Sequence, residues 1–475
     1  SEQDPQWGLR RDRIILSWLN RHSCPGPNGQ PWTLPRALPD YFADFVIAQM
    51  TFIMGGGHIP GYSHHDLYWI GKKPIITPLG PAHDSNSVRD ISVGNWQLRS
   101  AEEEGVAPVV EKATSIFHPA NVGWIKGRLI NQPITRVNRR VYKARLLERP
   151  FATLLLDFLK AFPSVLLHSM WAVMQAQGWP AHYIRLFRYV HTDMVQVTKL
   201  FGTTHKGPVK RAGLWTGSGA STILLLCLID VLLRELYRSP GFSWDSEEDA
   251  SVDGFADDLT GFFPTPHHLH FFRCTIDSFK SWSGVGPSIP KTILVLPPWE
   301  MYRQHIWAQV VWPGIKIAVE GDTLGVPVGC LLKPDELYRT VRAKFDLAVS
   351  AWMEKALAKS DIALLWNCFL LPRLSYLAQF FLPPKSLLTH LSKVLKRIYR
   401  VGPSFPGILL HFSDWILRET VGPLIPEVWY ATVMMRASHQ MEPDLCLASG
   451  LNAHKWREGS IDWQQSQLPK RFGLL

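Results

Sequence analysis

One stretch, residues 251–263, constrains this chain more than any other. It reads S-V-D-G-F-A-D-D-L-T-G-F-F and sets Asp257 next to Asp258. The β-branched and aromatic neighbours favour strand, and adjacent side chains of a regular strand point to opposite faces. A tight turn that brings both carboxylates together therefore needs a compensating cation, and a divalent metal is the simplest one. Taken alone, such a pair in a surface turn is more often simply solvated.

A second acid, Asp157, follows a short apolar run. Residues 151–165 read F-A-T-L-L-L-D-F-L-K-A-F-P-S-V after Pro150, a pattern typical of a buried strand that ends at the acid. Carboxylates at strand ends can converge on a metal from distant parts of a sequence. Two Mg²⁺ ions held roughly 3.5–4 Å apart activate an attacking oxygen and stabilise a leaving one.

The two acid motifs together resemble a known family. D-F-L-K-A-F from Asp157, followed by F-A-D-D from Phe255, is similar to the palm motifs of reverse transcriptases, most closely those of non-LTR (LINE-type) retrotransposons. Other segments resemble further motifs of that family, in the family's order: V-R-D-I-S at 88–92, N-V-G-W-I-K-G-R at 121–128, G-L-W-T-G-S-G-A-S-T-I-L-L-L at 213–226, P-K-T at 290–292, T-L-G-V-P-V-G at 323–329 and L-L-P-R-L-S-Y at 370–376.

The resemblance implies an α+β right-hand polymerase fold, with fingers, a palm built on an antiparallel sheet and a helical thumb. The expected divisions are an N-terminal extension at 1–70, fingers at 71–150, the palm at 151–332, the thumb at 333–430 and a C-terminal tail at 431–475. Apolar periodicity predicts a buried helix at 223–236 and amphipathic helices at 335–358 and 385–400. We assign no structure to 435–475.

The implied activity is RNA-directed DNA polymerisation on an RNA template, a DNA primer and a dNTP. In the family's arrangement, Asp157, Asp257 and Asp258 are catalytic and hold two Mg²⁺ ions, with Mn²⁺ as an alternative. Lys291 neutralises charge at the leaving pyrophosphate, and a structural lysine beside a proline-rich turn is the alternative. We see no endonuclease or ribonuclease H sequence in the chain.

The residues expected at the nucleotide are Arg89, Phe158, Phe162, Thr216 and Gly217. Phe162 stands where the family has an aromatic gate that crowds a ribose 2′-hydroxyl, so it implies deoxynucleotide substrates. An ion pair with Asp90 is the alternative role for Arg89, and helix packing is the alternative for Phe162.

The loop at 216–219 departs from the family's pattern. The family has glutamine at the position of Thr216 and prolines at those of Gly219 and Thr222. The departures leave open a catalytically inactive protein, derived from a reverse transcriptase, that binds RNA or belongs to an assembly. An RNA-templated RNA polymerase is a further alternative, against which Phe162 argues.

Basic residues predict contacts with nucleic acid. The net charge is +10, which favours association with a polyanion, and cations are dense after residue 127. The residues expected to contact template or duplex are Arg128, Arg136, Arg139, Arg140, Lys393, Lys396 and Arg397. Solvated helix faces are the alternative, since Ile134, Val137, Val141 and Leu146 form an apolar stripe beside the first group.

The remaining features concern compartment. The six cysteines have no zinc-binding spacing, and the longest apolar run, 223–229, is much shorter than the ~18–20 residues of a membrane span. We therefore expect an intracellular protein, nuclear or cytoplasmic, that is neither secreted nor membrane-spanning. Its oligomeric state is open.

Overall fold

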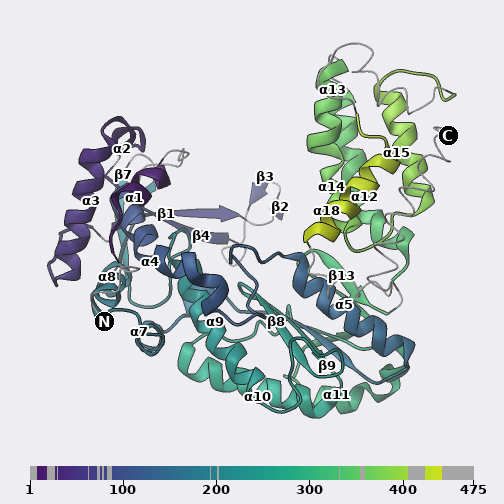
Figure 1. The fold of residues 1–475 in the computed structure, drawn as a ribbon, viewed down its shortest axis with the longest axis horizontal. Helices are drawn as coiled ribbons and strands as arrows, with labels where there is room; N and C mark the ends of the chain where they lie inside the picture. The colour runs from purple at the N-terminus through teal and green to yellow at the C-terminus, as the bar shows by residue number, and fades with distance from the viewer. Residues whose placement is uncertain are drawn as a thin grey trace.

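The computed structural model describes residues 8–18, 27–28, 30–62, 64–71, 75–77, 80–82, 88–192, 194–200, 203–330, 332–353, 359–404 and 423–440. They form a mixed α/β structure with two main sheets and a separate group of C-terminal helices (Figure 1). Figure 1 shows the first sheet and the C-terminal helices rising from opposite ends of the central sheet. None of the helices in these stretches has the length and apolar character needed to cross a bilayer.

The first sheet has the strand order β4-β1-β6-β7 and is accompanied by N-terminal helices. The elements of this region are α1 (Arg11–Trp18), α2 (Thr33–Ala37), α3 (Pro39–Met54), β1 (His64–Gly71), β2 (Ile75–Thr77), β3 (Gly80–Ala82), β4 (Val88–Gly94), α4 (Trp96–Ile116), β6 (Met194–Leu200) and β7 (Thr203–Lys210). Strands β6 and β7 fall within the predicted 151–332 unit, yet β6 pairs with β1 in this sheet. The sheet is thus built from two distant parts of the sequence.

The central sheet has the order β11-β10-β5-β9-β8. Its strands and the short elements near them are β5 (Ala152–Asp157), α6 (Ala161–Ser164), α7 (Leu167–Ala176), α8 (Ala181–His191), β8 (Ser251–Phe255), β9 (Asp258–Phe263), β10 (Ile293–Val295), the 3₁₀ helix η3 (Pro298–Arg303), α11 (Gln304–Val310), β11 (Lys316–Ala318), β12 (Glu320–Thr323) and β13 (Val326–Gly329). The strand predicted to end at Asp157 is confirmed, and the stretch 251–263 forms two antiparallel strands joined by a turn.

Helices cover both faces of the central sheet. Helices α9 (Ser221–Tyr237) and α10 (Pro266–Ser283) lie on one face, and α5 (Asn131–Leu146) lies on the other (Figure 1). Alternation along the strands explains this arrangement, because Val252 joins the core beneath α9 while the next residue, Asp253, meets α5. The predicted buried helix at 223–236 is confirmed as α9, most of whose residues are buried.

The C-terminal helices have their own hydrophobic core, which includes Tyr338, Phe345 and Trp366. They are α12 (Pro334–Met353), α13 (Lys359–Leu365), the π-helix η4 (Trp366–Leu370), α14 (Pro372–Ala378), α15 (Lys385–Ile398) and α18 (Pro426–Gln440). Both predicted amphipathic helices are confirmed, although 354–358 lie outside the described residues. Helix α18 extends through 435–440, to which the sequence had assigned nothing, and 441–475 also lie outside them.

Candidate active site

Three acidic residues lie near one another at one end of the central sheet. Asp157 is the last residue of β5 and is paired in register with Asp258, the first residue of β9. Asp257 lies in the turn between β8 and β9, and its carbonyl accepts a hydrogen bond of 3.2 Å from the Phe158 amide. The structure therefore brings together the three acids that the sequence predicts to act together.

The electrostatics of the three acids reflect this crowding. Burial, followed by the neighbouring charges of Asp257 and Asp157, raises the pKa of Asp258 to about 6. Lys291 opposes that rise, and its ammonium lies 2.5 Å from a carboxylate oxygen of Asp157. Lys291 comes from the turn after Ser288, whose amide donates to the Asp157 carbonyl at 2.7 Å. The lysine is thus held at the acids by its own backbone turn.

The donor set suits a hard divalent cation. Carboxylates that repel one another strongly enough to raise a pKa gain from a shared positive charge, and oxygen ligands are those that Mg²⁺ prefers. Within the described part of the chain, no three His, Cys, Asp or Glu side chains already form a ready-made metal cage. Such a cage is not required, because Mg²⁺ is usually held by one or two carboxylates together with substrate phosphates and water.

The strand before the turn that carries Asp257 is hydrogen-bonded to residues 120–122, a segment distant in the sequence. Ala256 has a φ of 55°, a left-handed conformation that is costly for a residue with a Cβ atom. The amide of Val122 donates to the Gly254 carbonyl at 2.7 Å, and the Gly254 amide donates to the Ala120 carbonyl at 2.8 Å. A Cβ atom at Gly123 would lie only 2.4 Å from the Ala256 nitrogen, so this close approach requires glycine.

A pocket of about 280 Å³ contains three of the predicted nucleotide residues, Phe162, Thr216 and Gly217. The other lining residues come from α4, the following loop residues and the first turn of α9: Arg99, Glu103, Trp215, Ser218, Gly219, Ser221 and Thr222. Hydrogen bonds join the two walls, since the Leu214 amide donates to the Phe162 carbonyl at 2.7 Å. The gate residue and the unusual loop are therefore parts of one pocket.

The other two residues predicted to contact the nucleotide are Phe158 and Arg89. The Phe158 side chain is 1% exposed and packs against Phe279 in the core. The prediction that it contacts a nucleotide is therefore wrong, and its backbone instead positions Asp257. Arg89 lies in β4, the strand whose Ser92 amide donates to the Thr216 carbonyl at 2.8 Å. Its contact with a triphosphate remains a prediction.

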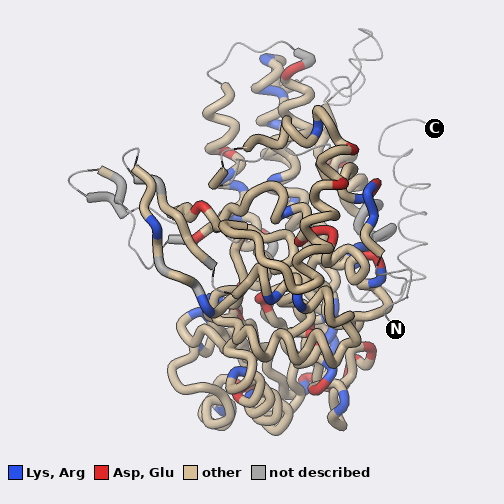
Figure 2. The backbone as a smooth tube through the Cα atoms, turned by 90° about the vertical axis from the view of Figure 1, so that its left-hand side faces the viewer, with Lys and Arg blue, Asp and Glu red and all other residues tan. Residues whose placement is uncertain are grey.

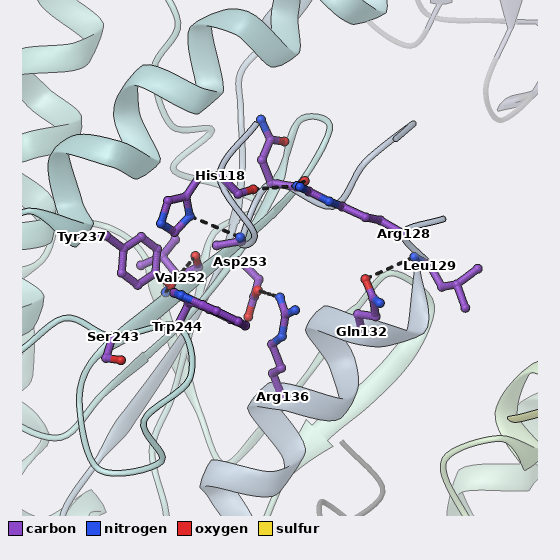
Figure 3. Close-up of polar contacts among 12 residues, drawn as sticks. His118, Arg128, Leu129, Gln132, Arg136, Tyr237, Ser243, Trp244, Val252 and Asp253 are labelled. Carbon is purple, nitrogen blue, oxygen red and sulfur yellow. Dashed lines mark hydrogen bonds and ion pairs between the residues drawn. The ribbon is translucent and has the colours of Figure 1, made fainter. Parts of the chain in front are cut away.

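The side chain of Arg128 binds backbone carbonyls of the segment that precedes it (Figure 3). Its guanidinium donates to the carbonyls of Thr114, Phe117, His118 and Asn121 at 2.9, 2.8, 2.6 and 2.5 Å. These carbonyls lie at and just after the C-terminus of α4, where a cation is favoured by the helix dipole. The prediction that Arg128 contacts nucleic acid is therefore wrong, because its N–H donors already bind the backbone next to residues 120–122, the segment that is hydrogen-bonded to Gly254.

The arginines of α5 also differ from the prediction. Arg136 is buried and forms a 2.6 Å ion pair with buried Asp253 of β8 (Figure 3). Arg140 is buried as well and donates to the carbonyls of Ser243, Trp244 and Ser246. The prediction that these two residues contact a template is therefore wrong. Arg139 is partly exposed and forms an ion pair with Glu247.

The basic residues of α15 are more accessible. Lys393 and Arg397 are exposed, and the Lys396 ammonium donates to the Pro403 carbonyl at 2.6 Å. The opposite side of α15, with Leu391 and Leu395, is buried in the C-terminal core. Across the described chain, Lys and Arg positions are spread over many parts of the backbone (Figure 2). Contact of α15 with a duplex remains a prediction.

Sequence reasoning missed the residues of α4 that face the pocket. Arg99 and Glu103 line it, and Glu102 lies behind it, where its carboxyl accepts a 2.6 Å hydrogen bond from the Ser218 hydroxyl. Burial, with a smaller contribution from Glu103, raises the pKa of Glu102 to about 8. No local pattern identifies Glu102, because its partner Ser218 lies more than a hundred positions away in the sequence.

Comparisons with known proteins give limited similarity. No family model matches the chain, and a search of curated proteins finds no match. Among solved structures, apo telomerase of Candida tropicalis truncated from its C-terminal domain is similar at 11% identity and a TM-score of 0.40, over 57% of this chain and 54% of that one. Telomerase of Candida albicans with a TWJ fragment of telomeric RNA is similar at 10% identity and a TM-score of 0.43, over 86% of this chain and 66% of that one. The corresponding Candida tropicalis complex is similar at 11% identity and a TM-score of 0.44, over 89% of this chain and 67% of that one. This chain thus spans between about half and two thirds of those telomerase chains.

Proposed function

We propose that this protein is a template-directed nucleotidyltransferase of the reverse-transcriptase type, related to the enzymes of non-LTR retrotransposons. The reaction is attack of a primer 3′-hydroxyl on the α-phosphorus of a dNTP, directed by an RNA template. A new phosphodiester bond forms, the bond to pyrophosphate breaks, and the hydroxyl proton passes to water.

The observation that carries this proposal is the pairing of Asp157 with Asp258 on neighbouring central strands, with Asp257 in the adjoining turn. The acids come from the two segments that resemble palm motifs, and the fold gives them one location. The first sheet and the C-terminal helices rise on either side, as fingers and thumb do around a palm (Figure 1).

The carboxylates of Asp157 and Asp257, assisted by Asp258, would hold Mg²⁺. When bound, the ions would lower the pKa of the attacking hydroxyl and neutralise charge on the departing pyrophosphate. The protein's own contribution is position and fixed charge. Lys291 is 63% exposed and reaches Asp157, so it lies within reach of a phosphate at these acids.

The pocket lined by Phe162, Thr216 and Gly217 would receive the incoming nucleotide. The bulk of the Phe162 ring on the pocket wall favours a deoxyribose over a ribose. The exposed cations Lys393 and Arg397 of α15 would follow the backbone of the primer–template duplex, which is recognised by charge and not by sequence.

The test is primer extension on poly(rA)/oligo(dT) with dTTP and Mg²⁺. We expect extension by the parent protein and none by the double variant Asp257→Ala/Asp258→Ala. A matched control is Asp40→Ala/Asp44→Ala, which removes two exposed carboxylates of α3 that form ion pairs with Arg11. The control should extend the primer as the parent does.

Two results contradict the proposal. Extension that survives loss of Asp257 and Asp258 would show that the chemistry occurs elsewhere. A folded parent that extends no primer but binds the RNA/DNA duplex with a strong salt dependence would instead support the non-catalytic alternative. Parallel reactions with rNTPs separate reverse transcription from RNA synthesis.

A further inference from the structure

The loop that follows Leu214 has few restraints of its own. It reads W-T-G-S-G-A from Trp215, with glycines at two of six positions. Gly217 has a φ of 118°, and a Cβ atom there would lie 2.6 Å from the Ser92 carbonyl oxygen. Glycine-rich backbone loses much conformational entropy on ordering, so contacts from outside the loop must define its shape.

Ser218 is the centre of those contacts. Its hydroxyl oxygen accepts from the amides of Ala220 and Ser221 at 3.1 and 3.3 Å, at the start of α9. The same hydroxyl donates to the Glu102 carboxyl at 2.6 Å. One side chain therefore connects the loop, the first turn of α9 and the second turn of α4.

Glu102 is well suited to hold that hydroxyl. It is 1% exposed, and the His191 ring of α8 lies 3.5 Å from the same carboxyl oxygen. The other groups whose charge bears on it are Arg99 and Glu103 of α4 and buried Tyr62 from the segment before β1. Burial keeps the carboxyl protonated near neutral pH, and a neutral buried acid is retained at a cost that its hydrogen bonds must offset.

The next residue of α4 shapes the next residue of the loop. A Cβ atom at Gly219 would lie 2.7 Å from Cγ of Glu103, so the loop passes α4 too closely for a larger residue. Two consecutive glutamates thus contact two consecutive loop residues. Glycine at 219, where related enzymes have proline, fits this close passage of α4.

We propose that Glu102 is a positioning residue that fixes the pocket loop 215–220 through the hydroxyl of Ser218. In doing so, Glu102 sets the apparent affinity of the pocket for the incoming nucleotide. This second statement rests on the proposed function, whereas the link between Glu102 and the loop is independent of it. Glu102 touches no substrate, and its effect passes through Ser218.

The test compares four full-length variants. Glu102→Leu removes the acceptor and Ser218→Ala removes the donor, while Glu102→Gln keeps an oxygen acceptor of the same size. Glu104→Gln is the matched control, because it alters a buried glutamate of the same helix whose partner is Arg13 and not the loop. Ser218→Ala changes only a hydroxyl, so it tests the contact even if Glu102→Leu does not fold.

The first readout is amide hydrogen exchange of the peptide covering 214–222. We expect Ser218→Ala and Glu102→Leu to exchange roughly tenfold faster there, as for the loss of one buried hydrogen bond. Glu102→Gln and Glu104→Gln should match the parent. Unchanged exchange in Ser218→Ala would overturn the proposal.

The second readout is the KM for dTTP in primer extension. Ser218→Ala should raise KM about tenfold with little change in kcat. The single variant Glu102→Gln should keep the KM of the parent. Above a pH of about 8, where Glu102 of the parent ionises, its carboxylate accepts the Ser218 hydroxyl more strongly, because that hydrogen bond favours the charged form, so the parent KM should fall while that of Glu102→Gln stays flat. A loss of kcat at constant KM would overturn the assignment to nucleotide affinity. A parent without polymerase activity refutes the proposed function alone, because hydrogen exchange decides by itself whether Glu102 holds the loop.

Discussion

The buried ion pair between Arg136 and Asp253 gives a sharp prediction, because sequence and structure disagree about the arginine. The side chains are 8% and 4% exposed and lie 2.6 Å apart, and the guanidinium also lies 5.6 Å from the centre of the Trp244 ring. We predict that Arg136→Met strongly destabilises the fold and leaves the affinity for nucleic acid unchanged.

The magnitude follows from what the substitution leaves behind. Methionine fills much of the space of the arginine stem, but Asp253 is then buried without its cation. Breaking a buried pair from one side costs about 3–5 kcal/mol, whereas replacing both partners by apolar residues is often neutral. We therefore expect Arg136→Met/Asp253→Leu to recover most of the lost stability. The control Arg139→Met, whose pair with Glu247 is partly exposed, should cost about 1 kcal/mol or less.

Two assays decide the outcome. Urea denaturation followed by tryptophan fluorescence gives the free energy of unfolding of each variant, and duplex binding across a range of salt gives the number of phosphate contacts. Arg136→Met should keep the salt slope of the parent. A slope reduced by about one unit, together with stability within about 1 kcal/mol of the parent, would refute the buried-pair reasoning and restore the template contact.

Three further predictions concern the site and its supports. Folding raises the pKa of Glu102 to about 8, so the folded chain holds that proton more tightly than the unfolded chain. As the pH rises from the ordinary carboxyl pKa to about 8, the parent should therefore lose stability relative to Glu102→Gln by about 1.4 kcal/mol per pH unit. Parallel plots of unfolding free energy against pH for the two proteins would contradict this prediction. Gly123→Ala should cost about 1–3 kcal/mol and abolish primer extension, because its Cβ would meet the backbone of Ala256. Gly402→Ala is its control, since a Cβ atom there would meet open space and the residue has no positive φ, and an equal loss of extension in both variants would contradict the packing argument. Phe162→Ala should increase incorporation of rNTPs relative to dNTPs roughly tenfold, and an unchanged ratio in competitive extension would remove the residue from sugar selection.

The acids of the site could be predicted from sequence because their signal is local. A buried strand ending in Asp157 and a turn between two strands at Asp257 are patterns of a few residues each, and the structure has both. The basic residues of α5 had an equally strong pattern, yet it misled. Their partners are Asp253 and carbonyls of residues 243–246, more than a hundred positions away, and no helical period reveals that the polar face of α5 lies on the central sheet.

The same limit explains Phe158. An aromatic residue directly after an acid proposed to bind metal is as consistent with a substrate contact as with a core residue. The alternation along β5 continues one residue beyond the strand, through a bridge between Phe158 and Pro287, and turns the ring into the core. Because Pro287 is remote in sequence, only the folded structure distinguishes the two roles.

Helix α4 shows how burial can contradict a pattern of charge. Three consecutive glutamates, 102–104, would ordinarily indicate a solvated face, since glutamate is almost never fully buried unless it is paired. Glu102 and Glu104 are nevertheless both buried, and successive residues of a helix are turned by about 100°, so the two side chains point in nearly opposite directions. One meets Ser218 of the pocket loop, and the other meets Arg13 of α1 at 2.6 Å. Helix α4 must therefore be enclosed on two sides, and it joins the N-terminal helices to the wall of the pocket. Any movement of α4 that breaks the pair with Arg13 would also shift the carboxyl that holds Ser218.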